Sequence, residues 1–403
     1  MALSHWKQNG NEVLVSHKET AITISLTPED IITYDHGGRL IGSYEHGLNY
    51  RRSLDNKVQK RWRVMEGDKE HLMHKLLDPT ATENIIEGYR RQLVRLLDDR
   101  STGTAHPDTR LILEAAAAFS WERLELDAAR FKLLYGHVPI LPPDQYRALL
   151  IQATDGCTYN KCTFCTLYRE KSFYTRPFDD FQNHLGGVLD FLGAGISYRN
   201  SIFLGDANAI AIDTQKLLKM LSMIKQYDEL MSVVKMGGIH AFLDIYTGTR
   251  KSVEEYRALA NAGIRRISLG VESGSEALLE FVQKPGSRED IASVVRTIKQ
   301  AGINLNVILM VGLGGKDFQD RHREESLSLG RELELDRGDI IYLSRFDPSP
   351  TAPYLAHADS KSLVPLTSTE LAEQTIIWQH ELASVLGPRG PKIVPYSFQR
   401  FLY

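Results

Sequence analysis

Apolar and polar positions change their spacing near residue 145, and the chain beyond that point predicts strands that alternate with helices. Short apolar runs are separated there by amphipathic stretches. Ala-Gly-Ile triplets at 194–196, 262–264 and 301–303 each follow a helical stretch, where glycine readily ends a helix. The apolar runs predict six strands, over residues 148–153, 201–204, 232–236, 266–271, 305–311 and 340–343.

Alternation of strands and helices predicts an α/β fold with a parallel sheet, because parallel neighbours need a crossover connection. Helical crossovers are right-handed, so the sheet curls in one direction. Six units are too few to close an eight-stranded barrel. Residues 145–355 are therefore predicted to form a partial, three-quarter parallel β/α barrel of six strands. Its active site is expected at the carboxyl ends of those strands.

The first 140 residues follow a different pattern, which predicts a separate N-terminal domain. Alternating apolar and polar residues between about 10 and 50 predict a small antiparallel β-meander. The following stretch, 49–56, is polar and rich in turn formers, and its arginines are interpreted as part of a solvated loop.

Helical spacing extends from about residue 68 to 135 and completes this domain. Thr80 or Thr82 is suited to cap one helix, and Gly136 is suited to end a helix over 108–135. The proline-rich stretch 137–143 cannot continue a helix, so the domain boundary is placed there.

The C-terminal segment, 356–403, is predicted to form a helix and an aromatic tail that packs on the barrel. The tail is expected to be ordered from about residue 390 and to shield part of the reactive site, because closing a site prevents side reactions. The side chains behind this expectation are Tyr396, Phe398, Phe401, Leu402 and Tyr403.

Composition places the chain among ordinary globular proteins, with 42% hydrophobic and 25% charged residues. A net charge of −3 argues against nucleic-acid binding, which rests on a basic surface. The N-terminus carries no apolar signal core, and no run reaches the roughly 18 apolar residues of a membrane span. Three cysteines with no evident disulfide pairing favour a cytoplasmic protein.

The three cysteines, Cys157, Cys162 and Cys165, lie within nine positions directly after the first predicted strand. Thiolates clustered in this way are typical of a metal site. A plant-type 2Fe-2S site needs a fourth cysteine, which the chain lacks. A zinc site with three cysteines and one histidine has no histidine at finger-like spacing, since the nearest downstream is His184. The third alternative is a cubane cluster with one iron open to an external ligand.

This loop, with Phe164 before its last cysteine, resembles the radical S-adenosylmethionine (SAM) superfamily. The resemblance to its coproporphyrinogen-dehydrogenase-like and methylthiotransferase-like branches extends over about residues 145–355. The usual family spacing is C-x3-C-x2-C, and this chain has one extra residue between the first two cysteines. The resemblance implies a 4Fe-4S cluster, with SAM on the open iron. One electron from that cluster cleaves SAM to methionine and a 5′-deoxyadenosyl radical.

The resemblance also implies cofactor-binding residues at the strand ends. Asp206, after the second strand, corresponds to an acid that takes the methionine amino group, with capping of the next helix as the alternative. Lys284 is a candidate for the methionine carboxylate, with a solvated helix end as the alternative. The glycines of 312–315 either cradle phosphate or let the backbone approach the adenine. The expected cofactor contacts are Phe164, Gly205, Asp206, Glu272, Ser273, Lys284 and Gly312.

No cysteines remain for auxiliary clusters, so the resemblance implies a single-cluster enzyme that abstracts hydrogen from a small-molecule substrate. A flavodoxin- or ferredoxin-type electron donor is implied as its partner. The alternative is a non-enzymatic iron–sulfur or zinc protein that carries electrons or serves as a scaffold. Candidates for substrate contact and catalysis, all near strand ends, are Tyr168, Arg169, Arg345 and Asp347.

Overall fold

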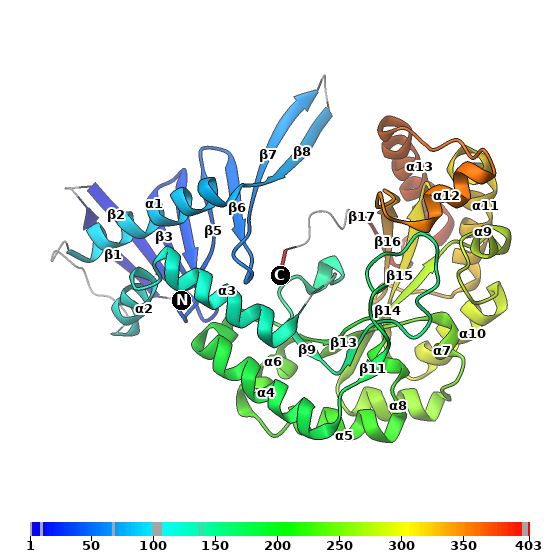
Figure 1. Ribbon diagram of the computed structural model, residues 1–403, viewed down its shortest axis with the longest axis horizontal. Helices are drawn as coiled ribbons and strands as arrows, with labels where there is room; N and C mark the ends of the chain where they lie inside the picture. The colour runs from blue at the N-terminus through cyan, green and yellow to red at the C-terminus, as the bar shows by residue number, and fades with distance from the viewer. Residues whose placement is uncertain are drawn as a thin grey trace.

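The computed structural model describes residues 2–8, 11–66, 69–98, 107–136, 138, 140–396 and 402–403. In Figure 1 an antiparallel sheet with its helices lies on the left, and a curved parallel sheet with outer helices lies on the right. The described part of the chain contains no helix that is long and apolar enough to cross a membrane.

The N-terminal sheet has eight antiparallel strands in chain order, a larger meander than predicted. Alternate residues such as Val15, Ile24 and Ile32 point to one face, where Ile86 and Leu93 of the first helix cover them. The strands are β1 (Ala2–Gln8), β2 (Asn11–His17), β3 (Ile22–Thr27), β4 (Asp30–Tyr34), β5 (Leu40–Glu45), β6 (Leu48–Arg52), β7 (Val58–Glu66) and β8 (Lys69–Leu76).

Three helices follow: α1 (Pro79–Asp98), α2 (Pro107–Ala117) and α3 (Trp121–Tyr135). The solvated-loop interpretation of 49–56 is wrong, because much of it is strand β6 and Arg52 is buried. Asp78, not Thr80 or Thr82, accepts a backbone hydrogen bond from the first turn of α1. Gly136 ends α3 with φ 61°, as predicted. In the predicted proline connector, His137 and Pro139 lie outside the described residues.

The second sheet is parallel and confirms the predicted partial β/α barrel, with seven strands in place of six. Its strand order is β17-β16-β15-β14-β13-β12-β9, and no pairing between β17 and β9 closes it within the described residues. The strands are β9 (Leu149–Gln152), β12 (Ile202–Gly205), β13 (Ile239–Leu243), β14 (Ile264–Glu272), β15 (Asn304–Val311), β16 (Ile340–Arg345) and β17 (Lys392–Tyr396). A two-stranded ribbon of β10 (Thr154–Asp155) and β11 (Tyr174–Thr175) flanks the loop after β9.

Helices cover the outer face of this sheet (Figure 1). The helices of this half of the chain are α4 (Phe178–Leu192), α5 (Thr214–Ile224), α6 (Asp228–Gly237), α7 (Ile245–Gly248), α8 (Val253–Asn261), α9 (Glu276–Phe281), α10 (Arg288–Gln300), α11 (Gly315–Glu332), α12 (Pro353–Ser360) and α13 (Ser368–Leu386). Short 3-10 helices are η1 (Pro143–Gln145), η2 (Gly193–Tyr198) and η3 (Ala209–Ala211).

Two predictions within the barrel need correction. Residues 232–236 belong to helix α6, and the third strand is β13, which begins at Ile239. Leu230 and Val233, three residues apart, are the buried side of that helix, so helical spacing prevails over β-branched composition. Gly263 and Gly302 take the expected positive φ, 114° and 78°, but at the first triplet Gly193, which precedes it, does so instead of Gly195.

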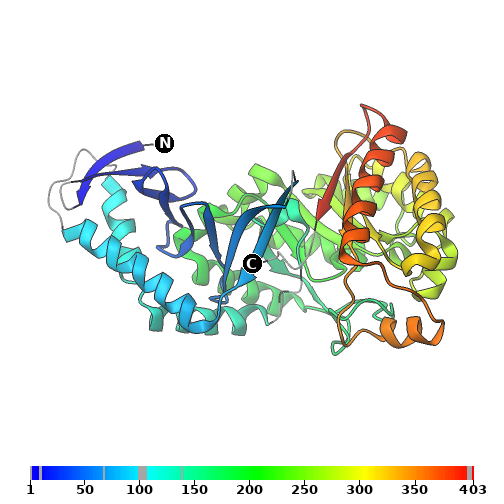
Figure 2. The same cartoon turned by 90° about the horizontal axis from the view of Figure 1, so that it is seen from above.

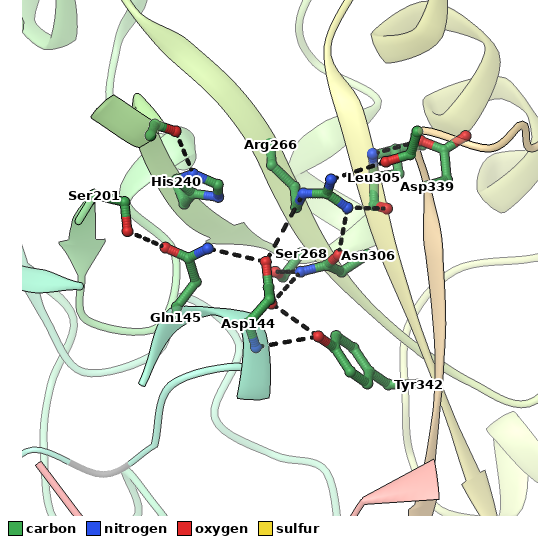
Figure 3. Close-up of polar contacts among 12 residues, drawn as sticks. Asp144, Gln145, Ser201, His240, Arg266, Ser268, Leu305, Asn306, Asp339 and Tyr342 are labelled. Atoms are coloured by element: carbon green, nitrogen blue, oxygen red, sulfur yellow. Dashed lines mark hydrogen bonds and ion pairs between the residues drawn. The ribbon is translucent and has the colours of Figure 1, made fainter. Parts of the chain in front are cut away.

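A polar network closes the amino end of the barrel (Figure 3). Asp144 of η1 accepts hydrogen bonds from the Asn306 amide and the Tyr342 hydroxyl, both at 3.0 Å. Arg266 donates to Asn306 at 2.9 Å and to the Gly338 carbonyl at 2.8 Å. Because these residues start different strands, the network ties η1 across the foot of the sheet.

The N-terminal domain is joined to the barrel through buried charge. Arg39 of the meander donates to both carboxylate oxygens of Asp127 on α3, at 2.7 and 2.9 Å. It also donates to the carbonyls of Phe191 and Leu192 at the C-terminus of α4, where a cation is favourable. This arginine therefore connects the meander, α3 and the barrel.

The C-terminal tail packs on the barrel in its described part, but at the foot of β9. The free edge of β9 exposes the backbone of Leu150, whose amide donates to the Tyr403 hydroxyl at 2.7 Å. The Tyr135 hydroxyl donates to the Leu150 carbonyl at 3.0 Å. Phe398 and Phe401 lie outside the described residues. Tyr396 is part of β17, the seventh strand of the sheet.

Candidate active site at the carboxyl end of the barrel

The three cysteines lie half-buried in the loop between β10 and β11, at the carboxyl end of β9. Thr163 anchors this loop: its amide donates to the Val282 carbonyl at 2.9 Å, and its carbonyl accepts from the Tyr354 amide of α12 at 3.0 Å. Figure 2 shows α12, in orange, beside the loop. The exposed Arg169 donates to the carbonyls of Cys162 and Cys165. The loop is thus held from outside by Val282 and Tyr354 and from within by Arg169.

The thiols lie within electrostatic reach of one another. Burial raises the pKa of Cys162 to about 11, Lys284 opposes that shift, and the neighbouring thiols add to it. Burial also raises the pKa of Cys165. Thiolates crowded in this way need a positive partner, and an iron–sulfur cluster provides one.

The described residues contain no group of three or more His, Cys, Asp or Glu side chains placed to hold one metal ion. A cubane does not require such convergence, because each thiolate bonds a separate iron atom. The donor set of three soft ligands therefore fits a cluster better than the single zinc ion considered from the sequence.

Asp206 follows β12 and is buried, with 4% of its surface exposed. Its Oδ1 accepts from the Gln152 side chain at 2.9 Å, and its Oδ2 has no partner. Burial raises its pKa to about 7, the Gln152 hydrogen bond lowers it and Asp155 raises it further. Asp206 does not cap the next long helix, because Asp213 caps α5. The carboxylate therefore has a free buried acceptor.

Glu272 and Lys284 form a buried ion pair at the end of β14, with Oε1 and Nζ 3.5 Å apart. Lys284 is not a solvated helix end, since 12% of its side chain is exposed. Glu272 has φ 65°, a strained value for a residue with a side chain, and its Oε2 has no partner. Burial raises the pKa of Glu272, while Lys284 opposes that shift.

The remaining residues predicted to contact the cofactor lie against other parts of the protein. Phe164 packs against the apolar cluster of Leu278, Val282 and Tyr354. The Ser273 hydroxyl contacts His322 Nδ1 at 2.7 Å, inside the junction of β14 with α11, so we leave it out of the proposed cofactor set. A side chain at Gly205 would meet Leu150, and one at Gly312 would meet Leu371 of α13. The glycine turn after β15 therefore serves close packing of protein segments.

The predicted substrate residues divide into two kinds. Tyr168 is buried, and its carbonyl accepts from Asn160 within the cysteine loop. Arg169 clamps the loop carbonyls as described above. Arg345 and Asp347, at the end of β16, are exposed at the rim.

Asp244, a residue not predicted from the sequence, joins the cysteine loop to two strand ends. It follows β13 and accepts hydrogen bonds from Thr158, next to the first cysteine, and from Asn208 after β12. Its backbone amide donates to Asn208 at 3.1 Å. The sequence feature that could have indicated Asp244 is its position directly after a strand. It was overlooked because the third strand was predicted at 232–236.

We compared the chain with known protein families, curated proteins and solved structures. Residues 151–327 match the family model described as Radical SAM superfamily. The chain is 23% identical to the heme chaperone HemW of Bacillus subtilis over 185 residues, which cover 45% of this chain and 47% of that protein. It is 24% identical to tRNA-2-methylthio-N(6)-dimethylallyladenosine synthase of Aliivibrio fischeri over 53% of this chain and 44% of the synthase.

The chain thus matches less than half the length of these two relatives. Among solved structures, coproporphyrinogen III oxidase HemN of Escherichia coli is similar over 67% of this chain and 58% of the oxidase, with 16% identity and a TM-score of 0.43.

This chain contains a radical SAM domain, which confirms the resemblance seen in the sequence. Residues 151–327 are thus similar to an enzyme superfamily whose members use a 4Fe-4S cluster and SAM.

Proposed function

We propose that the protein is a single-cluster radical SAM enzyme that cleaves SAM reductively and abstracts hydrogen from a small-molecule substrate. One observation supports this most strongly. Three buried acceptor atoms without partners, Asp206 Oδ2, Glu272 Oε2 and Gln152 Oε1, lie at the same end of the barrel as the three thiols. A buried acceptor without a donor is costly, so this end of the barrel suits a ligand that carries donors and positive charge.

In this proposal the three cysteines hold the cluster and the strand ends orient SAM. Asp206 Oδ2 accepts from the SAM amino group, and Lys284 meets its carboxylate while staying beside Glu272. When bound, the cluster and SAM together supply the electron transfer and the carbon-centred oxidant. Asp244 fixes the cysteine loop against β12 and β13 through Thr158 and Asn208.

The substrate is proposed to enter from the rim, near the exposed Arg345 and Asp347 at the end of β16. Tyr396 of the seventh strand lies in the electrostatic field of Glu272 and is a further candidate for substrate contact. A small-molecule substrate agrees with the net charge of −3, and a flavodoxin- or ferredoxin-type protein is proposed as the electron donor in the cytoplasm.

Anaerobic reconstitution with iron and sulfide tests the proposal. We expect one 4Fe-4S cluster per chain and formation of 5′-deoxyadenosine from SAM with a chemical reductant. The Arg110→Gln variant, changed at an exposed residue of α2, is the matched control and should behave as the wild type. A reconstituted cluster that never cleaves SAM would indicate an electron carrier, and bound zinc in place of iron would indicate a structural metal site.

A further inference from the structure

A second concave site lies far along the chain from the cysteines, between the N-terminal sheet and the foot of the barrel. It is a groove of about 630 Å³, within the size range of small-molecule sites. Strands β4 to β8 form one wall, and Arg147 and Tyr198, which precede β9 and β12, form the other. We name it the arginine groove.

Strand register explains the wall formed by the sheet. Ile31, Tyr44, Asn49 and Arg61 are consecutive cross-strand partners on β4 to β7, so their side chains share one face. Ile32 is buried with the helices on the opposite face. The face that lines the groove is thus the one that α1 leaves uncovered.

Charge in the groove has one sign. Among the described residues its lining includes four arginines and no Asp or Glu, although the whole chain carries a net charge of −3. The arginines are Arg51, Arg61, Arg63 and Arg147.

Two of these arginines are held in place at the foot of the barrel. Arg147 donates to the Tyr198 carbonyl at 3.0 Å, and its guanidinium carbon lies 4.5 Å from the centre of the Tyr198 ring. Its Nε is buried without a partner. Arg51 donates to the Tyr146 carbonyl at 3.2 Å. Burial lowers the pKa of Arg51, a cost that a bound anion would relieve.

Aromatic and amide groups complete the lining. Tyr44 and Tyr198 offer ring surfaces, and Asn49 offers both a donor and an acceptor. Guanidinium groups bind phosphate oxygens well, often through two parallel hydrogen bonds. A tyrosine ring can stack with a planar heterocycle, whichever nucleobase that heterocycle is.

We propose that the arginine groove binds a phosphorylated small molecule with a planar ring, of the chemical class of a nucleoside diphosphate. A free ligand is favoured over a nucleic-acid strand because the cations converge on one pocket and the protein as a whole is acidic. The site is independent of the radical chemistry proposed above.

Calorimetric titration of the full-length protein with uridine 5′-diphosphate tests this proposal. The uridine nucleotide is used because SAM contains adenosine, and an adenosine nucleotide could bind in the proposed SAM site. We expect saturable binding of the diphosphate, with uridine and inorganic pyrophosphate each binding at least about tenfold more weakly, since each retains only one kind of contact. Arg147→Gln should weaken binding about tenfold or more, because it removes a charged donor.

Two further variants make the result decisive. Arg63→Gln, at an exposed position of β7, should weaken binding, with circular dichroism as the check that it folds, whereas Arg110→Gln makes the same charge change on α2 and should have no effect. The proposal is overturned if the diphosphate does not bind, if the groove variants bind as tightly as the Arg110→Gln control, or if only a single-stranded oligonucleotide binds.

Discussion

Both ends of the parallel sheet carry buried polar side chains, but the two ends differ in how those side chains are paired. At the amino end, Asp144, Asn306 and Tyr342 bond to one another, and Gln145 joins Asp144 to Ser201. At the carboxyl end, Asp206, Glu272 and Gln152 each retain a buried oxygen without a partner. The exceptions at the amino end are nitrogen donors or ring atoms: His240 Nδ1, Arg147 Nε and Arg199 Nε have no partner.

The difference separates stabilising polar groups from ligand-binding ones. A paired network contributes to folding and needs nothing further, whereas unpaired buried acceptors lower stability unless a ligand supplies donors. Mutations at the two ends of the sheet should therefore have opposite effects on stability and on cofactor binding. Changes at the amino end should reduce stability and leave cofactor binding intact, and changes at the carboxyl end should do the reverse.

The largest expected effect is loss of activity on removing a thiol. Cys157→Ala, Cys162→Ala and Cys165→Ala should each abolish formation of 5′-deoxyadenosine, because a cubane held by two thiolates loses its anchoring. Iron content and product formation are the measurements. Retention of cleavage in any one variant would show that this cysteine is not a ligand.

Asp144→Ala should cause the largest loss of stability among single changes at the amino end. It leaves the Tyr342 hydroxyl and the Asn306 and Gln145 amides without their acceptor, at a cost of about 2–4 kcal/mol. Urea denaturation of the protein without cofactors measures this loss. An Asp144→Ala variant that is as stable as the wild type would show that this hydrogen-bond network does not stabilise the fold.

Asp206→Ala should weaken SAM binding by about 1.5–3 kcal/mol, the value of a hydrogen bond to a charged group. Its stability without SAM should change little, because loss of the Gln152 hydrogen bond is offset by removal of a buried carboxylate that has an unpaired oxygen. Equilibrium dialysis against SAM, with cluster content as the control, measures the effect. Normal affinity would assign Asp206 a role in the local fold.

The Asp206 carboxylate should also make the free energy of unfolding depend on pH. Its pKa rises from 3.8 to about 7 in the folded protein, so folding favours the protonated form. The free energy of unfolding of the apo protein should therefore decrease as pH rises from about 4 to about 7. Asp206→Asn should reduce that slope, and an identical slope in the variant would exclude Asp206 as its source.

The smallest expected effect concerns the tail. Tyr403→Phe removes the acceptor for the Leu150 amide at the free edge of β9 and should destabilise the protein by about 1–3 kcal/mol. It should leave SAM cleavage unchanged, since Tyr403 contacts the foot of the barrel. A shift in uncoupled 5′-deoxyadenosine formation would instead support the shielding role expected from the sequence.

Local signals in the sequence sufficed for the barrel and for the cysteine loop. Three cysteines within nine positions need no long-range information, and Gly263 and Gly302 mark helix ends by their own conformation. The seventh strand was missed because β17 is short and lies at the start of the tail that was predicted to shield the site. The pairing of Glu272 with Lys284, and the use of Ser273 by His322, depend on tertiary contacts that spacing does not encode.

The most direct test is the electron paramagnetic resonance spectrum of the reduced cluster with and without SAM, in three proteins. We predict that SAM changes the spectrum of the wild type and of Asp144→Ala, and that at the same SAM concentration it changes that of Asp206→Ala much less. A spectrum that SAM leaves unchanged in the wild type, or that responds equally in Asp206→Ala, would contradict the assignment of the unpaired carboxyl end as the SAM site.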